Sequence, residues 1–126
     1  MRTIQHAALA GCLMAALSGA ATADDGFTTD HSTIQVVSTL VGGKNVYIPS
    51  TIAVVAGQKT TLSIFNTTEI PHGFRIPAAG IEVVLPAGEE LLVEVPALEG
   101  GAVHAINCHL HPAHRTATLL VLPAKD

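Results

Sequence analysis

Near its carboxyl end the chain reads Ile106-Asn107-Cys108-His109-Leu110-His111-Pro112-Ala113-His114, which is its stretch richest in candidate metal ligands. It holds one of the two cysteines and three of the seven histidines in the 126-residue sequence. A thiolate is a soft metal ligand and an imidazole a borderline one, so the two types placed this close together are typical of a copper or zinc site. A fourth histidine, His72 in Pro71-His72-Gly73-Phe74, is the candidate partner from elsewhere in the chain.

The sequence on both sides of this stretch has the pattern of short β-strands. Apolar and polar residues alternate, and turn residues such as Gly42-Gly43 interrupt them. We expect eight strands, at residues 33–40, 46–48, 51–55, 59–65, 82–85, 90–95, 102–107 and 116–122. No segment has the apolar spacing of an amphipathic helix, and the regular spacing of the expected strands predicts an antiparallel β-sandwich. Cys108, His111 and His114 would then lie on a tight loop between two neighbouring strands, and His72 on a second loop.

Residues 1–23 have the features of a cleavable secretory signal. Arg2 is followed by an apolar run at 7–16 and by Ala21-Thr22-Ala23, a small-residue cleavage site. A rival interpretation is a lipobox at Leu9-Ala10-Gly11-Cys12, with a lipid on Cys12. Only eight residues precede that motif and the apolar run continues beyond it, which favours cleavage after Ala23. We therefore expect a signal peptide at 1–23, one domain at 24–126, and export to the periplasm with no stable membrane anchor.

Removal of the signal would change the composition in a way that concerns metal binding. It leaves 103 residues with ten acidic and five basic side chains, a net charge of −5. Such a chain is unsuited to nucleic acid and suited to a basic protein partner. Both methionines and Cys12 leave with the signal, so Cys108 remains as the single cysteine. It cannot form an internal disulfide, and a bound metal would protect its thiol in an oxidising compartment.

A set of short motifs, taken in order, resembles the cupredoxin family over residues 46–122. The motifs are Phe65-Asn66, His72-Gly73-Phe74, Pro86-Ala87-Gly88-Glu89, and Cys108 followed by His111. The resemblance implies a Greek-key β-sandwich that binds copper at one end. Within the family the closest similarity is to nitrosocyanin-like mononuclear copper proteins. It rests on Gly73-Phe74-Arg75-Ile76, Gly80-Ile81-Glu82, Ala87-Gly88-Glu89 and Cys108-His109-Leu110-His111-Pro112.

The departures from these relatives define the expected ligand set. A binuclear copper site needs two cysteines, and residues 24–126 contain only one. The methionine ligand of blue copper sites is also missing there. Nitrosocyanin has a glutamate where this chain has His72, and its last histidine lies slightly further along. The resemblance therefore implies one copper ion per chain, bound by Cys108, His111 and His114, with His72 as the usual cupredoxin histidine.

Three functions are compatible with that site. The leading one is one-electron transfer by an exported mononuclear copper protein, with another redox protein as partner. The alternatives are a periplasmic copper-binding or copper-tolerance protein, and a nitrosocyanin-like redox enzyme with an open copper position. An electron carrier is favoured over an enzyme. The resemblance also implies a homo-oligomer, a trimer in nitrosocyanin-like proteins.

The remaining polar residues of these motifs have other interpretations. His104 has the same strand parity as Cys108, so we expect it to pack near the site, whereas His109 has the opposite parity and should point outward. Whether either histidine contributes to the site stays open. Asn66 is expected to pin loop backbone. A zinc hydrolase is disfavoured, because the acidic position of the H-x-H-x-D-H signature is Ala113 here.

Overall fold

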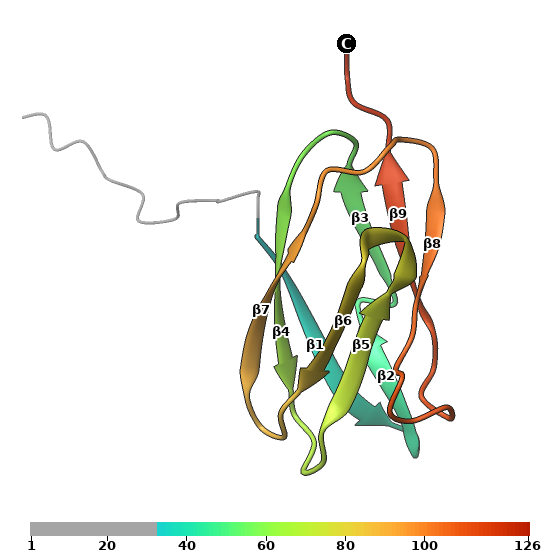
Figure 1. The fold of residues 1–126 in the computed structure, drawn as a ribbon. Coiled ribbons are helices and arrows are strands. Elements are labelled where there is room, and N and C mark those ends of the chain that lie inside the picture. Colours follow the sequence, from blue (N-terminus) through green and yellow to red (C-terminus); the bar gives the residue numbers. More distant parts are fainter. Residues whose placement is uncertain (1–32) are drawn as a thin grey trace, which may run out of the picture.

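The structure, a computed structural model, describes residues 33–126, and that part of the chain is a two-layered β-sandwich (Figure 1). It contains nine strands and one short 3-10 helix, which confirms the predicted all-β class. Their bounds are β1 Thr33–Val41, β2 Lys44–Ile48, β3 Thr51–Val55, β4 Thr60–Asn66, β5 His72–Ile76, η1 Pro77–Ala79, β6 Ile81–Leu85, β7 Glu90–Val95, β8 Val103–Ile106 and β9 Ala117–Leu122. No helix in residues 33–126 is long and apolar enough to cross a bilayer.

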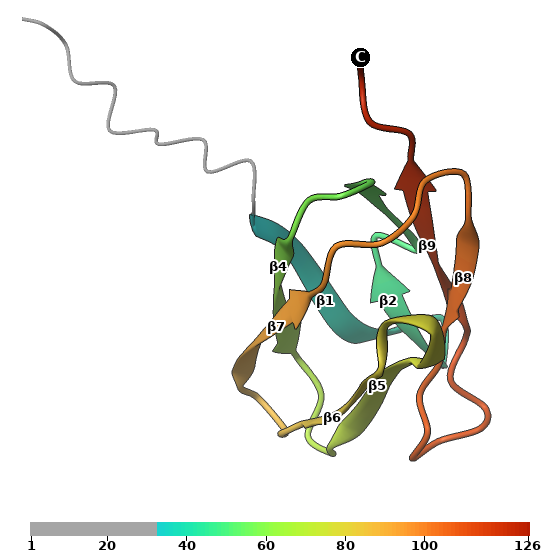
Figure 2. The same ribbon diagram turned by 45° about the horizontal axis from the view of Figure 1, so that its top comes forward.

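The strands form one four-stranded sheet and two smaller sheets, and a single β-bridge connects the two smaller sheets. The first has the order β2-β1-β4-β7, and the others are β3-β9-β8 and β5-β6. A bridge between Arg75 and Asn107, with both backbone hydrogen bonds at 2.9 Å, connects β5 to the end of β8. The tilted view in Figure 2 separates β5 and β6 from the layer that contains β1, β4 and β7.

The predicted antiparallel pairing is correct for four strand pairs and wrong for two, because β1 pairs with β4 and β3 pairs with β9 in parallel. Strand direction is not visible in a period-two pattern, since an alternating strand presents the same apolar face in either direction. The alternation itself is correct. In β7, for example, Val93 and Val95 are buried while Glu90 and Glu94 are exposed. Branched aliphatic side chains from both layers fill most of the core.

One strand was not predicted. His72 was expected on a loop, but it is the first residue of β5, which pairs with β6. Pro71 just before it and Gly73 inside it are unfavourable in strands, so the segment has the composition of a turn. The pairing places His72 opposite Leu85 in a regular ladder. This histidine is therefore held by a strand end rather than by a flexible loop.

Candidate metal centre

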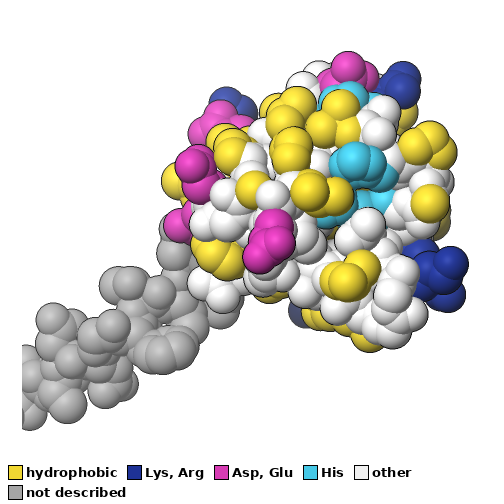
Figure 3. Space-filling view, turned by 90° about the horizontal axis from the view of Figure 1, so that it is seen from below, with side chains coloured by type: hydrophobic (Ala, Val, Ile, Leu, Met, Phe, Trp, Pro, Cys, Tyr) yellow, Lys and Arg dark blue, Asp and Glu magenta, His cyan; other side chains and the backbone are white. Residues whose placement is uncertain are grey.

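The candidate ligands lie at the end of the sandwich opposite the C-terminus. The β8–β9 loop, residues 107–116, and the β4–β5 loop, residues 67–71, both turn at this end (Figure 1). Because β8 and β9 are antiparallel neighbours, the sheet holds both ends of the loop that joins them. The predicted loop position of Cys108, His111 and His114 is confirmed. Seen from this end, histidine side chains reach the surface among hydrophobic ones (Figure 3).

The four predicted ligands come together. The ring centroid of His72 lies 5.0 Å from that of His111 and 5.1 Å from that of His114. The sulfur of Cys108 accepts a hydrogen bond of 3.1 Å from the backbone N–H of Gly73, the residue after His72. Cys108, His72 and His114 are buried, and His111 is half-buried. The thiol and three imidazoles thus share one small region although His72 is far from the others in sequence.

Several ring nitrogens in this region lack hydrogen-bond partners within residues 33–126. They are Nδ1 and Nε2 of His72, Nε2 of His114 and Nδ1 of His109, all buried. A buried polar atom without a partner costs about 1–3 kcal/mol, so such atoms are rare in folded proteins. A metal ion that accepts their lone pairs would remove this cost. The donor set, one thiolate and three imidazoles, is chemically suited to copper.

Backbone carbonyls fix the ring orientation of two of the candidate ligands. Nδ1 of His114 lies 3.0 Å from the carbonyl oxygen of Arg115, and Nε2 of His111 lies 2.9 Å from that of Pro71. A carbonyl oxygen only accepts, so each of these nitrogens carries the proton. The lone pair is then on Nε2 of His114 and on Nδ1 of His111. Histidine ligands in metalloproteins are commonly held in this way.

Within the described part of the chain, no three His, Cys, Asp or Glu side chains meet the geometry of a ready-made metal cluster. The ring-centroid spacings of 5.0 and 5.1 Å are nevertheless compatible with imidazoles that share one ion, because each ring centre would lie about 3 Å from a metal bound at ~2.0 Å. The residues therefore fit a copper ion by donor type and by ring spacing.

Asn66 fixes the loop that leads into His72. Its side-chain N–H groups donate to the carbonyls of Ile70, at 2.9 Å, and Leu85, at 3.2 Å. Its side-chain oxygen accepts from the backbone N–H and the hydroxyl of Thr68. All of these hydrogen bonds join the side chain of Asn66 to backbone or loop groups, which confirms the structural role predicted for Asn66. The rigid loop restricts where His72 can lie.

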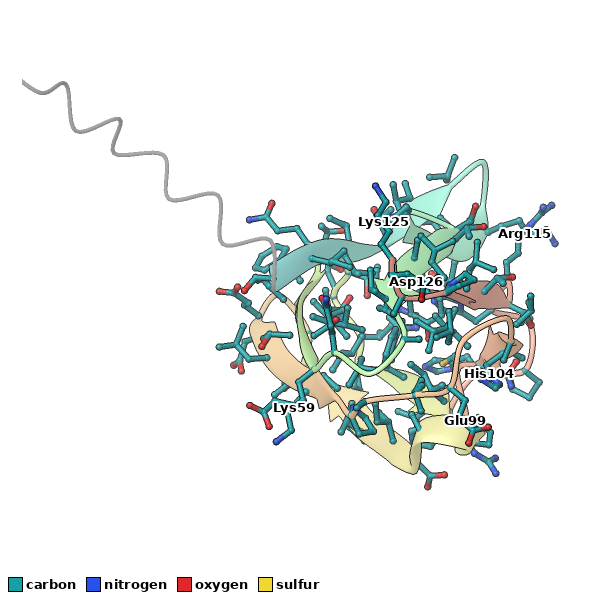
Figure 4. The ribbon with its side chains drawn as sticks, turned by 90° about the horizontal axis from the view of Figure 1, so that it is seen from above. Lys59, Glu99, His104, Arg115, Lys125 and Asp126 are labelled. Atoms are coloured by element: carbon teal, nitrogen blue, oxygen red, sulfur yellow. The ribbon has the colours of Figure 1, made fainter. Side chains whose placement is uncertain are left out.

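His104 and His109, whose contribution to the site was left open, have different environments. His109 is half-buried rather than pointing outward, since its ring lies against Gly73 and its Nδ1 is buried. His104 lies on β8, where it pairs with Leu119 of β9, and it is half-buried. Figure 4 shows His104 at the periphery of the sandwich. Neither belongs to the ring cluster around His72.

Sequence reasoning missed two residues that contact the site, Tyr47 and Gly73. The ring of Tyr47 lies 4.2 Å, centroid to centroid, from that of His114. Gly73 lies directly against the backbone and ring of His109. The sequence contains only one tyrosine, and a single buried aromatic in an alternating strand has no pattern that distinguishes it from the core.

Burial lowers the pKa of both His72 and His114 below the ordinary value of 6.5. The neighbouring imidazoles of His114 and His111 lower the pKa of His72 further. For His114 the hydrogen bond to the Arg115 carbonyl raises the pKa against the effect of burial, and the neighbouring His111 lowers the pKa further. Both side chains are therefore neutral at pH 7, with lone pairs available to a metal.

These lowered pKa values predict how the stability of the metal-free protein depends on pH. Its free energy of unfolding should be constant above about pH 6.5 and should fall as the pH drops from there towards the folded-state pKa values. In that window the unfolded chain binds protons at His72 and His114 that the folded chain does not. Urea unfolding of wild type and His72→Gln between about pH 8 and pH 5 measures this. Equal pH dependence in the two proteins would contradict the role of His72.

A β-sandwich with a cysteine and three histidines gathered at one end defines a class of small metal-binding β-proteins. The profile of the cupredoxin-like domain family matches residues 7–121, so the chain belongs to the cupredoxin-like domain family. This membership and the nine strands confirm the predicted cupredoxin-like fold. The nitrosocyanin-like assignment stays a proposal.

The solved structures that are similar to this chain include two copper proteins. The novel purple cupredoxin from Nitrosopumilus maritimus is 18% identical, with a TM-score of 0.49, covering 69% of this chain and 97% of that one. The blue copper oxidase from Nitrosomonas europaea is 16% identical, with a TM-score of 0.57 and 75% coverage of this chain. Only 39% of the oxidase is matched, so the chain spans less than half of its length. No curated protein matches the sequence. The likeness to the oxidase supports the fold alone.

Proposed function

We propose that this chain is a mononuclear copper protein that carries single electrons, with copper bound by His72, Cys108, His111 and His114. One observation carries the proposal. A buried thiol lies in one cluster with three imidazoles, and both ring nitrogens of His72 and Nε2 of His114 are buried without a hydrogen-bond partner within residues 33–126. Copper, when bound there, supplies a Cu(II)/Cu(I) couple. The cluster contains no methionine, which distinguishes it from a blue copper site.

Copper fits this arrangement better than structural zinc. A structural zinc site contributes the folding energy of a small domain. Here a core of branched aliphatic residues is buried between the two layers, so the folding energy can come from that core rather than from a metal. A thiolate combined with imidazoles on a rigid frame supports both oxidation states of copper. The Asn66 contacts and the β8–β9 pairing hold the ligands in place during electron transfer.

The surface around the site is suited to a redox protein partner. Histidine side chains emerge among hydrophobic ones at this end (Figure 3), and Ile70 and Leu110 beside the ligands are 47% and 40% exposed. Apolar surface rimmed by polar groups is typical of transient protein contacts. A partner docked here would be close to copper, with the half-buried His111 at the boundary.

Export and assembly complete the proposal. The features of residues 1–23 support cleavage after Ala23 and a periplasmic location, but they lie outside the described residues. Mature protein from the native host should begin at Asp24. The motif similarity to nitrosocyanin-like proteins supports a mononuclear site and a trimer, and size measurement of the purified protein tests the assembly.

Copper delivery is an alternative function, in which the protein would pass its ion to an acceptor. A redox enzyme with an open copper position is the remaining alternative. It would require that one of the four side chains does not bind the ion.

Copper reconstitution of the metal-free protein separates these functions. An electron carrier should bind one copper per chain, show an intense sulfur-to-copper band and exchange electrons rapidly with itself. A delivery protein should lose its copper to a chelator within the same period, and an enzyme should change its spectrum when azide or nitric oxide is added. Colourless protein containing stoichiometric zinc after growth in copper would contradict the copper assignment.

The His114→Met variant tests the fourth ligand. Imidazole is a stronger donor to Cu(II) than a thioether, which is softer and tolerates Cu(I) better. We therefore expect the variant to raise the reduction potential by at least ~59 mV, a tenfold change in relative affinity for the two oxidation states. Cyclic voltammetry measures this, with His104→Met as the control. A shift in the control alone would show that His114 is not a ligand.

A further inference from the structure

Tyr47 on β2 touches the candidate copper site although it comes from a strand without any ligand. Its side chain is 1% exposed. The ring makes a tilted contact with His114 at 4.2 Å and an edge-on contact with Phe74 at 5.3 Å. Aromatic contacts of this kind restrict ring orientation. The ring of Tyr47 thus limits the orientation of one proposed ligand, His114.

The hydroxyl group of Tyr47 reaches the other ligand-bearing segment. It donates a hydrogen bond to the carbonyl oxygen of Gly73, and the N–H of the same glycine donates to the sulfur of Cys108. Gly73 is the residue after His72. Tyr47 therefore links the His72 strand to the β8–β9 loop, and one glycine residue relays the contact to the thiol.

The hydroxyl stays protonated and close to the sulfur. Burial raises the pKa of Tyr47 well above its ordinary value of 10, and the neighbouring Cys108 raises the pKa further. The phenol is consequently a permanent hydrogen-bond donor at neutral pH. Donors inside a buried region act more strongly than donors in water.

We propose that Tyr47 is a positioning residue that sets the reduction potential of the copper site, by holding Gly73 so that its N–H points at the Cys108 sulfur. This inference rests on the proposed function. A hydrogen bond to a metal-bound sulfur withdraws electron density from it, and such bonds are known levers on the potential. A thiolate that donates less favours Cu(I), so the Tyr47 contacts raise the potential.

The Tyr47→Phe variant tests the hydroxyl while keeping the ring. We expect the ratio of Cu(I) to Cu(II) affinity to fall about tenfold, a decrease of ~59 mV in potential. The sulfur-to-copper band should move to longer wavelength, because the sulfur electrons rise in energy. In the metal-free protein the Gly73 amide should exchange with deuterium about tenfold faster, since its strand is held less firmly. A tyrosine with a merely structural role would change stability but not potential.

A control and a second protein complete the test. Ser63→Ala removes a hydroxyl that bonds Glu90 between β4 and β7, and it should leave the potential unchanged. Because Tyr47 is the only tyrosine, biosynthetic 3-fluorotyrosine changes this residue alone and keeps its ring and hydroxyl. Its more acidic hydroxyl should shift the potential upwards, so the test remains decisive if Tyr47→Phe does not fold.

Each outcome separates this inference from the proposed function. Wild type that binds no copper would overturn the proposed function and this inference with it. Wild type with the expected band, but with Tyr47→Phe and fluorotyrosine proteins at the same potential, would overturn the role of Tyr47 alone. An unchanged exchange rate at Gly73 in Tyr47→Phe would show that the hydroxyl does not hold that glycine.

Discussion

Replacing Cys108 with serine should abolish the visible absorption of the copper-loaded protein and lower its copper affinity by at least about 100-fold. The band arises from charge transfer out of the thiolate, and an alcohol oxygen has no comparable donor orbital. Losing a group that merely orients a ligand commonly costs 10–100-fold in affinity, so losing a ligand should cost about that much or more. Copper titration with optical and EPR detection measures both effects.

The control for this variant is His104→Ala, on the same strand side but outside the ring cluster. It should keep the band and the affinity of wild type. Cys108 is the one free cysteine in residues 33–126, so no neighbouring thiol there can replace it. A Cys108→Ser protein that keeps the band would contradict the thiolate assignment. If copper-loaded wild type is colourless and Cys108→Ser binds copper as tightly as wild type, the site is built from histidine alone.

The alternation of residues was enough to predict most strands, because each has one buried face. Residues 51–55 and 90–95 are β3 and β7 with the same bounds as predicted. The parallel pairing of β1 with β4 was not predictable in this way. It joins strands that are separated by β2 and β3 in sequence, and side-chain alternation contains no information about which strand lies beside which.

The candidate site was predictable in part for a similar reason. Cys108, His111 and His114 lie on one loop, so their proximity follows from their spacing. The position of His72 depends on the bridge between Arg75 and Asn107, a contact between distant strands. Tyr47 depends on a third strand, and its role is visible only when β2 is placed against the β8–β9 loop. Short-range patterns reveal donors, whereas long-range packing decides which groups orient them.

The same bridge explains why residue 73 is glycine. Arg75 and Asn107 are antiparallel partners, so continuing this register by two residues places Gly73 opposite His109. The backbones approach closely there. A Cβ atom built on Gly73 would lie 2.8 Å from the backbone nitrogen of His109 and would also clash with its ring. The flexible ring can move aside, but the backbone can move only if the β8–β9 loop moves with it.

Gly73→Ala should therefore disrupt the metal site more than its single methyl group suggests. We expect a loss of about 1–3 kcal/mol in stability from overpacking, together with at least about tenfold weaker copper binding, because displacing the β8–β9 loop moves Cys108 away from the Gly73 N–H that bonds its sulfur. Urea unfolding and copper titration measure the two effects.

Gly80→Ala is the matched control, since Gly80 has a φ of 65° and nothing within 4 Å of an added Cβ. That variant should lose comparable stability through backbone strain alone and keep the spectrum of wild type. If both variants bind copper equally well, the close approach at Gly73 does not hold the ligand loop, and the position of Cys108 is determined by β8 and β9 alone.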